Sequence, residues 1–193
     1  MPTLVLLHGM TGDADMIRPF ATSICPEGWD LLIPEARFSH PRRGKTWWRY
    51  QNEEGNRSIL NAIELSDVDA SLLDLAKIMP EGELVIGGFS QGGVLAQELL
   101  QFPFANRIMG ILCLGTRCIR PQELTIALQS LETRSMLWMH GQRDHRVSIA
   151  DGRVICDLFA DAGWNLTTIT HEKGHMIPTE HHEEIRQWLN SLL

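Results

Sequence analysis

A serine between two glycines is the feature of this sequence best suited to chemistry. Residues 84–86, Leu-Val-Ile, form an apolar run typical of a buried strand, and helical spacing begins at Val94. Between them stands Gly88-Phe-Ser90-Gln-Gly92, a Gly-x-Ser-x-Gly motif of the kind called a nucleophile elbow. A side chain at either glycine would collide with the neighbouring strand or helix, because the turn holds its serine in a strained conformation. The motif predicts a serine hydroxyl raised clear of a sheet, at the positive end of the following helix.

A serine hydroxyl becomes a good nucleophile only with a base within hydrogen-bond reach. In chains with this motif the order is nucleophile, acid, histidine. His175 follows the last expected strand in a loop whose glycine and proline permit a sharp approach to Ser90, so it is the predicted base. Other histidines are expected elsewhere. His181 and His182 would lie at the surface and His40 in an irregular loop, whereas His8 and His140 would lie in the core.

The predicted acid is Asp144, which follows the strand expected at residues 136–139. Its role would be to hold the imidazole in the correct tautomer, and the alternative is an ordinary turn aspartate. The negative charge that develops on the substrate needs two backbone N–H donors. We expect these from Gln91, the residue after the nucleophile, and from Met10, in the loop after the first strand.

A second motif competes for His175. His171-Glu-Lys-Gly-His175 matches the zinc-protease pattern His-Glu-x-x-His, which works because a helix places both histidines on one face. Here the motif follows a β-branched strand, contains Gly174 and meets Pro178, and no third ligand is apparent. We therefore expect no metal and no cofactor.

The remaining pattern predicts the elements that must position these residues. Apolar or β-branched runs indicate six strands, at residues 4–7, 30–33, 84–86, 107–114, 136–139 and 166–170. Six helices are expected between and after these strands. Three are given by ranges, 59–79, Val94 to Phe102 and Pro121 to 131. Three are given by their starts, one with Pro19 in its first turn, one capped by Ser148 and one capped by Thr179. This alternation predicts a single α/β domain over residues 1–193, whose parallel sheet is covered on both faces and whose ligands bind beyond the strand ends.

Composition narrows the class of protein. The net charge of −7 argues against a nucleic-acid partner, because phosphate binding is led by an excess of basic residues. It has no apolar run near 18 residues and no basic leader, so we expect no membrane span and a cytoplasmic location. Its four cysteines are expected to be reduced, and the oligomeric state, monomer or homodimer, is left open.

Three segments together resemble the phospholipase/carboxylesterase family of α/β-hydrolases, which includes acyl-protein thioesterases and bacterial carboxylesterases. They are Gly87-Gly-Phe-Ser-Gln-Gly-Gly93, Leu7-His-Gly-Met-Thr-Gly-Asp13 and Gly174-His175. The resemblance covers nearly the whole chain and implies the α/β-hydrolase fold. It also implies that Ser90, Asp144 and His175 form a catalytic triad, that Met10 and Gln91 form the oxyanion hole, and that Trp47 and Trp48 wall the acyl pocket.

The chain departs from the family pattern in two segments, which bear on the identity of the substrate. Arg49 replaces an acidic or small residue, and Leu114-Gly-Thr-Arg117 replaces a serine-containing segment. The long stretch 35–57 is irregular in pattern, which is typical of functional or mobile segments. It is also basic, with Arg37, Arg42, Arg43, Lys45, Arg49 and Arg57. One hypothesis is that this stretch recognises an ester with a negatively charged portion, and the alternative is a solvated loop that balances an acidic protein.

The leading hypothesis is a serine hydrolase that cleaves a small-molecule carboxylic ester or thioester through an acyl-enzyme. Lysophospholipase and acyl-protein thioesterase activities are alternatives within this chemistry. A non-catalytic α/β-hydrolase-like binding protein is an alternative from another class. The zinc-peptidase interpretation through His171 and His175 is disfavoured by the context of that motif.

Overall fold

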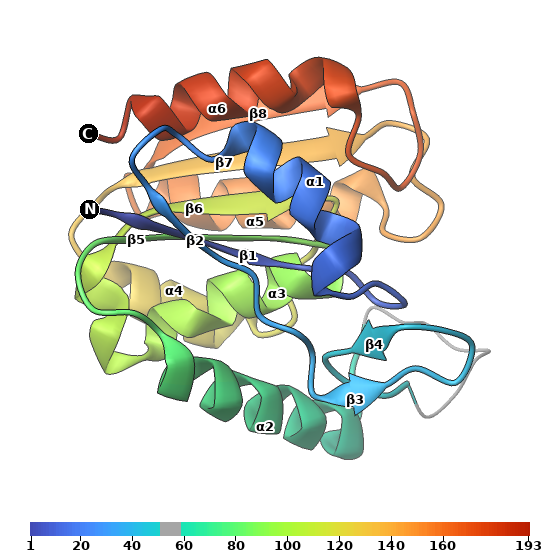
Figure 1. The fold of residues 1–193 in the computed structure, drawn as a ribbon. Helices are drawn as coiled ribbons and strands as arrows, with labels where there is room; N and C mark the ends of the chain where they lie inside the picture. Colours follow the sequence, from blue (N-terminus) through green and yellow to red (C-terminus); the bar gives the residue numbers. More distant parts are fainter. Residues whose placement is uncertain (51–58) are drawn as a thin grey trace.

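The computed structural model describes residues 1–50 and 59–193, which are organised around a parallel sheet (Figure 1). The described residues form six strands of this sheet, in the spatial order β2-β1-β5-β6-β7-β8. Their bounds are β1 Thr3–Leu7, β2 Asp30–Leu32, β5 Leu84–Phe89, β6 Ile108–Leu114, β7 Ser135–Gly141 and β8 Asn165–His171. Every neighbouring pair runs parallel, so the predicted α/β sheet is confirmed.

Helices cover both faces of the sheet (Figure 1). Side chains of α1 and α6 join one apolar core, and those of α2, α3, α4 and α5 join a second core on the opposite face. The bounds are α1 Ala14–Ile24, α2 Ala62–Ile78, α3 Gln91–Glu98, α4 Pro121–Ser130, α5 Ile149–Asp161 and α6 His182–Asn190. No helix within residues 1–50 and 59–193 is long and apolar enough to cross a bilayer.

The continuous apolar runs of the central strands reflect burial on both faces. In β1, Leu4 and Leu6 enter the core under α1 and α6, whereas Val5 and Leu7 enter the opposite core. Because successive strand residues point to opposite faces, a strand in this position needs apolar residues at every position.

Strands β1 and β5 are neighbours in the sheet, and Leu7 of β1 lies opposite Gly88 of β5. The loop that follows β1 therefore lies beside the turn that follows β5. The ends of β6, β7 and β8 lie further along the same edge of the sheet, because all six strands point the same way.

Helices α2 and α3 begin three residues from their predicted starts at 59 and Val94, whereas the signals predicted to start α1 and α6 are wrong. Helix α1 begins at Ala14, where the Asp13 carboxylate caps it by accepting a hydrogen bond from the Met16 N–H at 2.8 Å, so Pro19 lies inside the helix. The last helix begins at His182 without a side-chain cap, after a 3₁₀ turn, η3, at Thr179–His181. The expected Ser148 cap of α5 is confirmed by its bond from the Asp151 N–H.

The helix that follows β5 ends earlier than predicted. Its α-helical part stops at Glu98, and two 3₁₀ turns, η1 at Leu99–Gln101 and η2 at Pro103–Arg107, complete the connection to β6.

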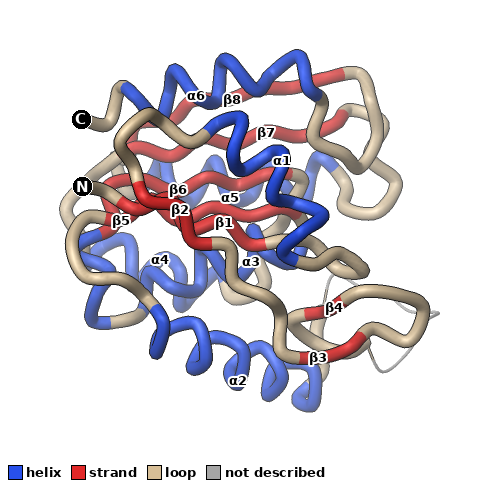
Figure 2. The backbone as a smooth tube through the Cα atoms, in the orientation of Figure 1, coloured by secondary structure: helices blue, strands red, loops and turns tan. Residues whose placement is uncertain are grey.

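The described part of the irregular stretch contains a small antiparallel hairpin that the sequence did not predict. It pairs β3 (Phe38–Ser39) with β4 (Lys45–Thr46), set apart from the main sheet (Figure 2). Hydrogen bonds from Thr11 N to Lys45 O at 2.9 Å and from Lys45 N to Gly12 O at 2.7 Å join it to the loop after β1. Gly44, with φ of +60°, permits this approach, because a Cβ there would lie 2.5 Å from the Thr11 carbonyl oxygen.

Candidate active site

Ser90 occupies a strained turn between β5 and α3, with φ of 55° and ψ of −115°. Positive φ is uncommon in residues other than glycine. A Cβ on Gly88 would lie 2.2 Å from the Gly92 carbonyl carbon, and a Cβ on Gly92 would lie 2.2 Å from the Leu7 carbonyl oxygen. Both glycines are thus needed for the close packing of strand, turn and helix, as the motif predicts.

Two hydrogen bonds fix this turn to the end of β6. The Ser90 N–H donates to the Leu114 carbonyl at 2.9 Å, and the Thr116 hydroxyl donates to the Ser90 carbonyl at 2.7 Å. The backbone that carries the serine hydroxyl is therefore held on the strand side as well as by the helix that follows.

The predicted acid and base form a short contact beyond the ends of β7 and β8. His175 Nδ1 lies 2.6 Å from Asp144 Oδ2. The other carboxylate oxygen, Oδ1, accepts hydrogen bonds from the Arg146 N–H at 2.8 Å and the Val147 N–H at 3.0 Å. Asp144 is fully engaged and buried, so it can orient the imidazole rigidly.

The environment of this pair shifts both pKa values downward. Burial lowers the pKa of His175, and the hydrogen bond and charge of Asp144 offset this only in part. Burial by itself would raise the pKa of Asp144, but the hydrogen bonds from Val147, His175 and Arg146 outweigh it and lower that pKa. At neutral pH the pair is therefore a neutral imidazole beside a carboxylate.

The imidazole of His175 packs beside Phe89, the residue before Ser90, with ring centroids 4.7 Å apart. Both Ser90 and His175 line the same cavity. Within the described residues, no hydrogen bond joins the serine hydroxyl to the imidazole. Such bonds are often long in ligand-free enzymes and tighten when substrate binds.

The cavity at this edge of the sheet has a volume of about 470 Å³ and combines an apolar wall with polar groups. Its apolar and aromatic lining consists of Met10, Met16, Ile17, Phe20, Trp48, Tyr50, Phe89, Val94, Val147, Met176 and Ile177. Convergent polar groups at one side of an apolar cavity are typical of small-molecule sites.

The two predicted oxyanion donors also line this cavity. Neither the Met10 N–H nor the Gln91 N–H has a hydrogen-bond partner among the described residues. Met10 precedes Thr11, whose φ of 66° turns the loop back toward the hairpin. Gln91 is the first residue of α3, where N–H groups point outward and the helix dipole favours negative charge.

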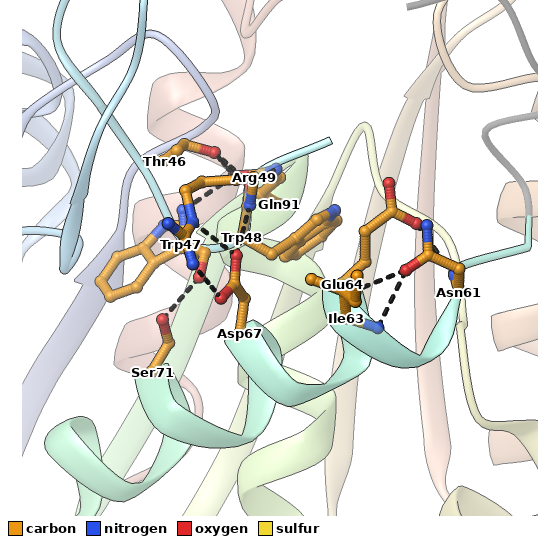
Figure 3. A network of polar contacts seen from close by, with 10 residues as sticks. All are labelled: Thr46, Trp47, Trp48, Arg49, Asn61, Ile63, Glu64, Asp67, Ser71 and Gln91. Carbon is orange, nitrogen blue, oxygen red and sulfur yellow. Dashed lines mark hydrogen bonds and ion pairs between the residues drawn. The ribbon is translucent and has the colours of Figure 1, made fainter. Parts of the chain in front are cut away.

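The Gln91 side chain has a separate structural role that sequence reasoning missed (Figure 3). Its Oε1 accepts hydrogen bonds from the Thr46 hydroxyl at 2.9 Å and from the Trp47 N–H at 3.0 Å. Its Nε2 donates to the Trp48 carbonyl at 3.2 Å. One buried amide thus anchors the whole 46–48 segment to the start of α3.

The two tryptophans expected to wall the pocket differ in position. Trp48 lines the cavity, but Trp47 does not. The Trp47 ring packs against His8 at 5.1 Å, and its indole N–H donates to the His8 carbonyl at 2.8 Å. Trp47 therefore packs against the loop after β1 and, unlike Trp48, does not line the main cavity.

Two further histidines are buried supports, as expected. His8 Nδ1 bonds the Gly9 carbonyl at 2.8 Å, and His8 Nε2 accepts from the Ala36 N–H at 3.1 Å, so the ring is neutral with its proton on Nδ1. His140 Nε2 bonds the Val147 carbonyl at 2.9 Å and lies 3.4 Å from Asp144 Oδ2, beneath the acid–base pair.

The His-Glu-x-x-His segment lacks the helix on which that motif depends. His171 is the last residue of β8, and the α-helix that follows starts only at His182. His175 is already bonded to Asp144. In the described part of the chain, no cluster of three or more His, Cys, Asp or Glu side chains could hold a metal ion.

Several basic residues of the irregular stretch lie near carboxylates. Arg37 pairs with Asp74, Lys45 lies 3.8 Å from Glu35, and Arg49 pairs with Asp67 at 2.8 Å. Arg43 lines the main cavity, and Arg42, Arg43 and Arg49 line an adjoining one of about 500 Å³. Arg57 lies outside the described residues.

Arg117 and Arg146, which sequence reasoning did not place at the site, also line the main cavity. Arg117 follows β6 and Arg146 follows β7, so each comes just after a strand end, as do the predicted residues. That position was the available signal, because ligands bind beyond the carboxyl ends of parallel strands.

The parallel sheet with a strained serine between β5 and α3 defines an α/β-hydrolase. The model of the phospholipase/carboxylesterase family matches residues 1–193, so the chain belongs to this family and is a hydrolase. The sequence-based assignment is thereby confirmed. A search among curated proteins returned no match.

Solved structures share the fold at low sequence identity. The structure of esterase PE8 superposes with a TM-score of 0.80 at 22% identity and covers 100% of this chain and 93% of that one. The carboxylesterase of Bacillus cereus gives a TM-score of 0.76 at 20% identity, covering 100% and 89%. Acyl-protein thioesterase 2 of Zea mays gives 0.73 at 18% identity, covering 99% and 93%.

Proposed function

We propose that this hydrolase cleaves carboxylic esters or thioesters through an acyl-enzyme formed on Ser90. His175 acts as general base and then general acid, and Asp144 holds its ring. The 2.6 Å contact between Asp144 and His175, at the rim of the cavity that Ser90 also lines, is the observation that carries the proposal. Three residue types in the required order along the chain support the same roles.

The hydrogen bonds of the pair define where the proton moves. Because Nδ1 of His175 faces a carboxylate oxygen, that nitrogen carries the proton and Nε2 is left as the base. Nε2 accepts the Ser90 proton as the serine oxygen bonds to the acyl carbon. Asp144 stabilises the imidazolium that results and remains ionised, in keeping with its lowered pKa.

The backbone N–H groups of Met10 and Gln91 are the proposed oxyanion hole. Met10 and Gln91 both line the cavity, and neither N–H has an acceptor among the described residues. The dipole at the start of α3 would also stabilise negative charge there. The tetrahedral intermediate collapses when His175 gives its proton to the leaving alcohol or thiol. A water molecule, deprotonated by His175, then attacks the acyl-enzyme and releases the carboxylic acid and free Ser90.

The cavity supports a small-molecule substrate with an apolar acyl portion. Trp48, Phe20 and Ile177 are among the apolar side chains that would contact it. Lysophospholipase and acyl-protein thioesterase activities differ from simple esterase activity in leaving group and chain length. They are therefore distinguished by substrate series.

A chain-length series of 4-nitrophenyl esters and matched thioesters, run with wild type and Ser90→Ala, tests the proposal. We expect turnover by the wild type and a loss of kcat on the order of a million-fold in Ser90→Ala. A fluorophosphonate should label the wild type at Ser90 and leave the variant unlabelled.

A non-catalytic binding protein would show the opposite result. It would neither react with the fluorophosphonate nor cleave any member of the series. Activity that survives Ser90→Ala and is lost on chelation would instead favour metal-dependent hydrolysis.

A further inference from the structure

The arginines at the main cavity contrast with the rest of this acidic chain. The net charge is −7, yet the charged side chains that line the cavity among the described residues are Arg43, Arg117 and Arg146. No described Asp or Glu lines it. Positive charge gathered in a cleft raises the local concentration of anions, whatever the sign of the whole molecule.

Arg117 is the most informative of the three because it is buried, with only 6% of its surface exposed. Its Nη2 is fully enclosed and has no hydrogen-bond partner in the described part of the chain. A buried guanidinium without an anion is costly, and native proteins normally pair it.

The backbone of Arg117 is held by a hydrogen bond, and its side chain is buried. The Gln97 Nε2 donates to the Arg117 carbonyl at 3.2 Å and to the Gly93 carbonyl at 2.9 Å, which ties the loop after β6 to α3. The preceding residue, Thr116, bonds the Ser90 carbonyl. Arg117 therefore directly follows Thr116, whose hydroxyl supports the turn that carries Ser90.

A nearby arginine shows how the same fold satisfies a structural guanidinium. Arg120, three residues further on, lies 3.0 Å from Glu98 and 2.7 Å from Asp69. Arg117 has neither kind of partner among the described residues. The fold therefore supplies carboxylate partners for Arg120, whereas the described residues supply none for Arg117.

Arg43 and Arg146 extend this positive lining outward. Both are exposed, and both also line the adjoining cavity, whose charged lining among the described residues is again arginine. The two cavities share Met10, so the basic surface runs past a proposed oxyanion donor.

We propose that Arg117, assisted by Arg43 and Arg146, binds an anionic group of the substrate, a carboxylate or a phosphate. The proposal rests on the esterase or thioesterase function and names the class of its substrate. The planar guanidinium offers paired N–H donors that match carboxylate and phosphate oxygens, and it stays charged when buried. Arg117 is a specificity-determining residue, and it leaves the chemistry at Ser90 unchanged.

Two matched substrate pairs test the proposal. The first is 4-nitrophenyl hydrogen glutarate against 4-nitrophenyl pentanoate, and the second is 1-butyrylglycerol 3-phosphate against 1-butyrylglycerol. We expect kcat/KM to favour the anionic member of at least one pair, on the order of tenfold or more, since charge-assisted hydrogen bonds are the strong ones. The pair that shows the preference identifies the anion.

Arg117→Met should abolish that preference through KM and leave the neutral members within about twofold of wild type. Arg153→Met is the control, because this exposed α5 residue has the same charge but lines neither cavity. The melting temperature of Arg117→Met should equal or exceed that of wild type, because an apolar side chain replaces an unpaired buried charge. A lower melting temperature with equal loss on both members of a pair would assign Arg117 a structural role.

Equal turnover of both members of each pair by the wild type would overturn the inference while leaving the esterase proposal intact. Failure of the esterase proposal is seen separately, as absent fluorophosphonate labelling. In that case calorimetric binding of glutarate and glycerol 3-phosphate decides the inference. Binding that is lost in Arg117→Met supports it, and no binding to the wild type overturns it.

Discussion

The side-chain carbonyl of Gln91 accepts a hydrogen bond from the Trp47 N–H at 3.0 Å, and this contact joins the proposed oxyanion hole to the cavity wall. The backbone of Gln91 supplies a candidate donor at the cavity, while its side chain holds the segment that carries Trp48. Loss of the side chain should therefore affect substrate binding without removing the donor.

Gln91→Met keeps an unbranched side chain but removes the hydrogen bonds to Thr46, Trp47 and Trp48. We expect a loss of about 1–3 kcal/mol in the free energy of unfolding, because a buried N–H is left without its acceptor. KM should rise by more than kcat falls, since the cavity wall loosens while the backbone donor stays. Urea unfolding and steady-state kinetics measure the two effects.

The control is Gln129→Met, at an exposed position of α4. This substitution should change neither the free energy of unfolding nor KM. A Gln91→Met variant as stable as wild type would show that the amide contributes nothing to holding the segment.

Asp144→Asn should lower kcat on the order of ten-thousand-fold. An asparagine can still accept from the Arg146 and Val147 N–H groups, so the fold is kept. It cannot hold the protonated Nδ1 of His175 as a carboxylate does, and the wrong tautomer is then favoured.

Stopped-flow and steady-state turnover of a neutral chromogenic ester measure this loss, with Asp151→Asn at the start of α5 as the control. Full activity in Asp144→Asn would exclude Asp144 as the orienting acid.

The lowered pKa of His175 predicts the acid side of the pH profile. Neutral imidazole is the active form, so kcat/KM should be constant at neutral pH and fall as the pH drops through the folded-state pKa, with a midpoint below the ordinary value of 6.5. Burial is the main cause of this lowering, and the positive charge of Arg146 adds to it.

Arg146→Gln should therefore move the midpoint upward, toward 6.5, when the profile is measured with a neutral ester. Because Arg146 is exposed, added salt should reduce the difference between variant and wild type. A midpoint above 6.5 in the wild type would contradict the burial argument.

Features that depend on neighbouring residues in the sequence, such as strands and the turn at Ser90, were predicted well. Each of the six strands is an apolar or β-branched run, and the elbow at Ser90 depends on two glycines four positions apart. The positions of Asp144 and His175 after β7 and β8 follow from the parallel topology, and their catalytic roles stay predictions. The helix starts at Ala14 and His182 were missed because capping and 3₁₀ turns compete with proline and threonine signals.

Features that depend on distant contacts were not predictable. Gln91 reads as a surface residue of a helix start, yet it is buried because Thr46 and Trp47 fold over it. Arg117 stood out only as a departure from family pattern, and its burial depends on how the loop after β6 packs against α3. The different positions of Trp47 and Trp48 likewise depend on the contact of Trp47 with His8.

The pairing of Arg49 with Asp67 gives a final prediction, about stability. Asp67 of α2 is buried and accepts from the Arg49 N–H at 3.0 Å, from Nε at 2.9 Å and from Nη2 at 2.8 Å (Figure 3). These bonds continue the anchoring of the segment that holds Trp48. Asp67→Ala should lower the free energy of unfolding by about 1–3 kcal/mol, because charge-assisted bonds to a buried carboxylate are lost.

The matched control is Asp74→Ala, seven residues along the same helix, where the carboxylate pairs with Arg37 and Lys77 in a more exposed setting. Its unfolding midpoint in urea should stay close to that of wild type. The hydrogen bond from Arg49 lowers the pKa of Asp67, so its contribution is complete above the unfolded-state value near 3.8 and is lost as the pH falls through the folded-state value. The stability difference between wild type and Asp67→Ala should accordingly shrink in acid, and a difference that persists unchanged well below pH 3.8 would show that packing, and not the charge, stabilises this contact.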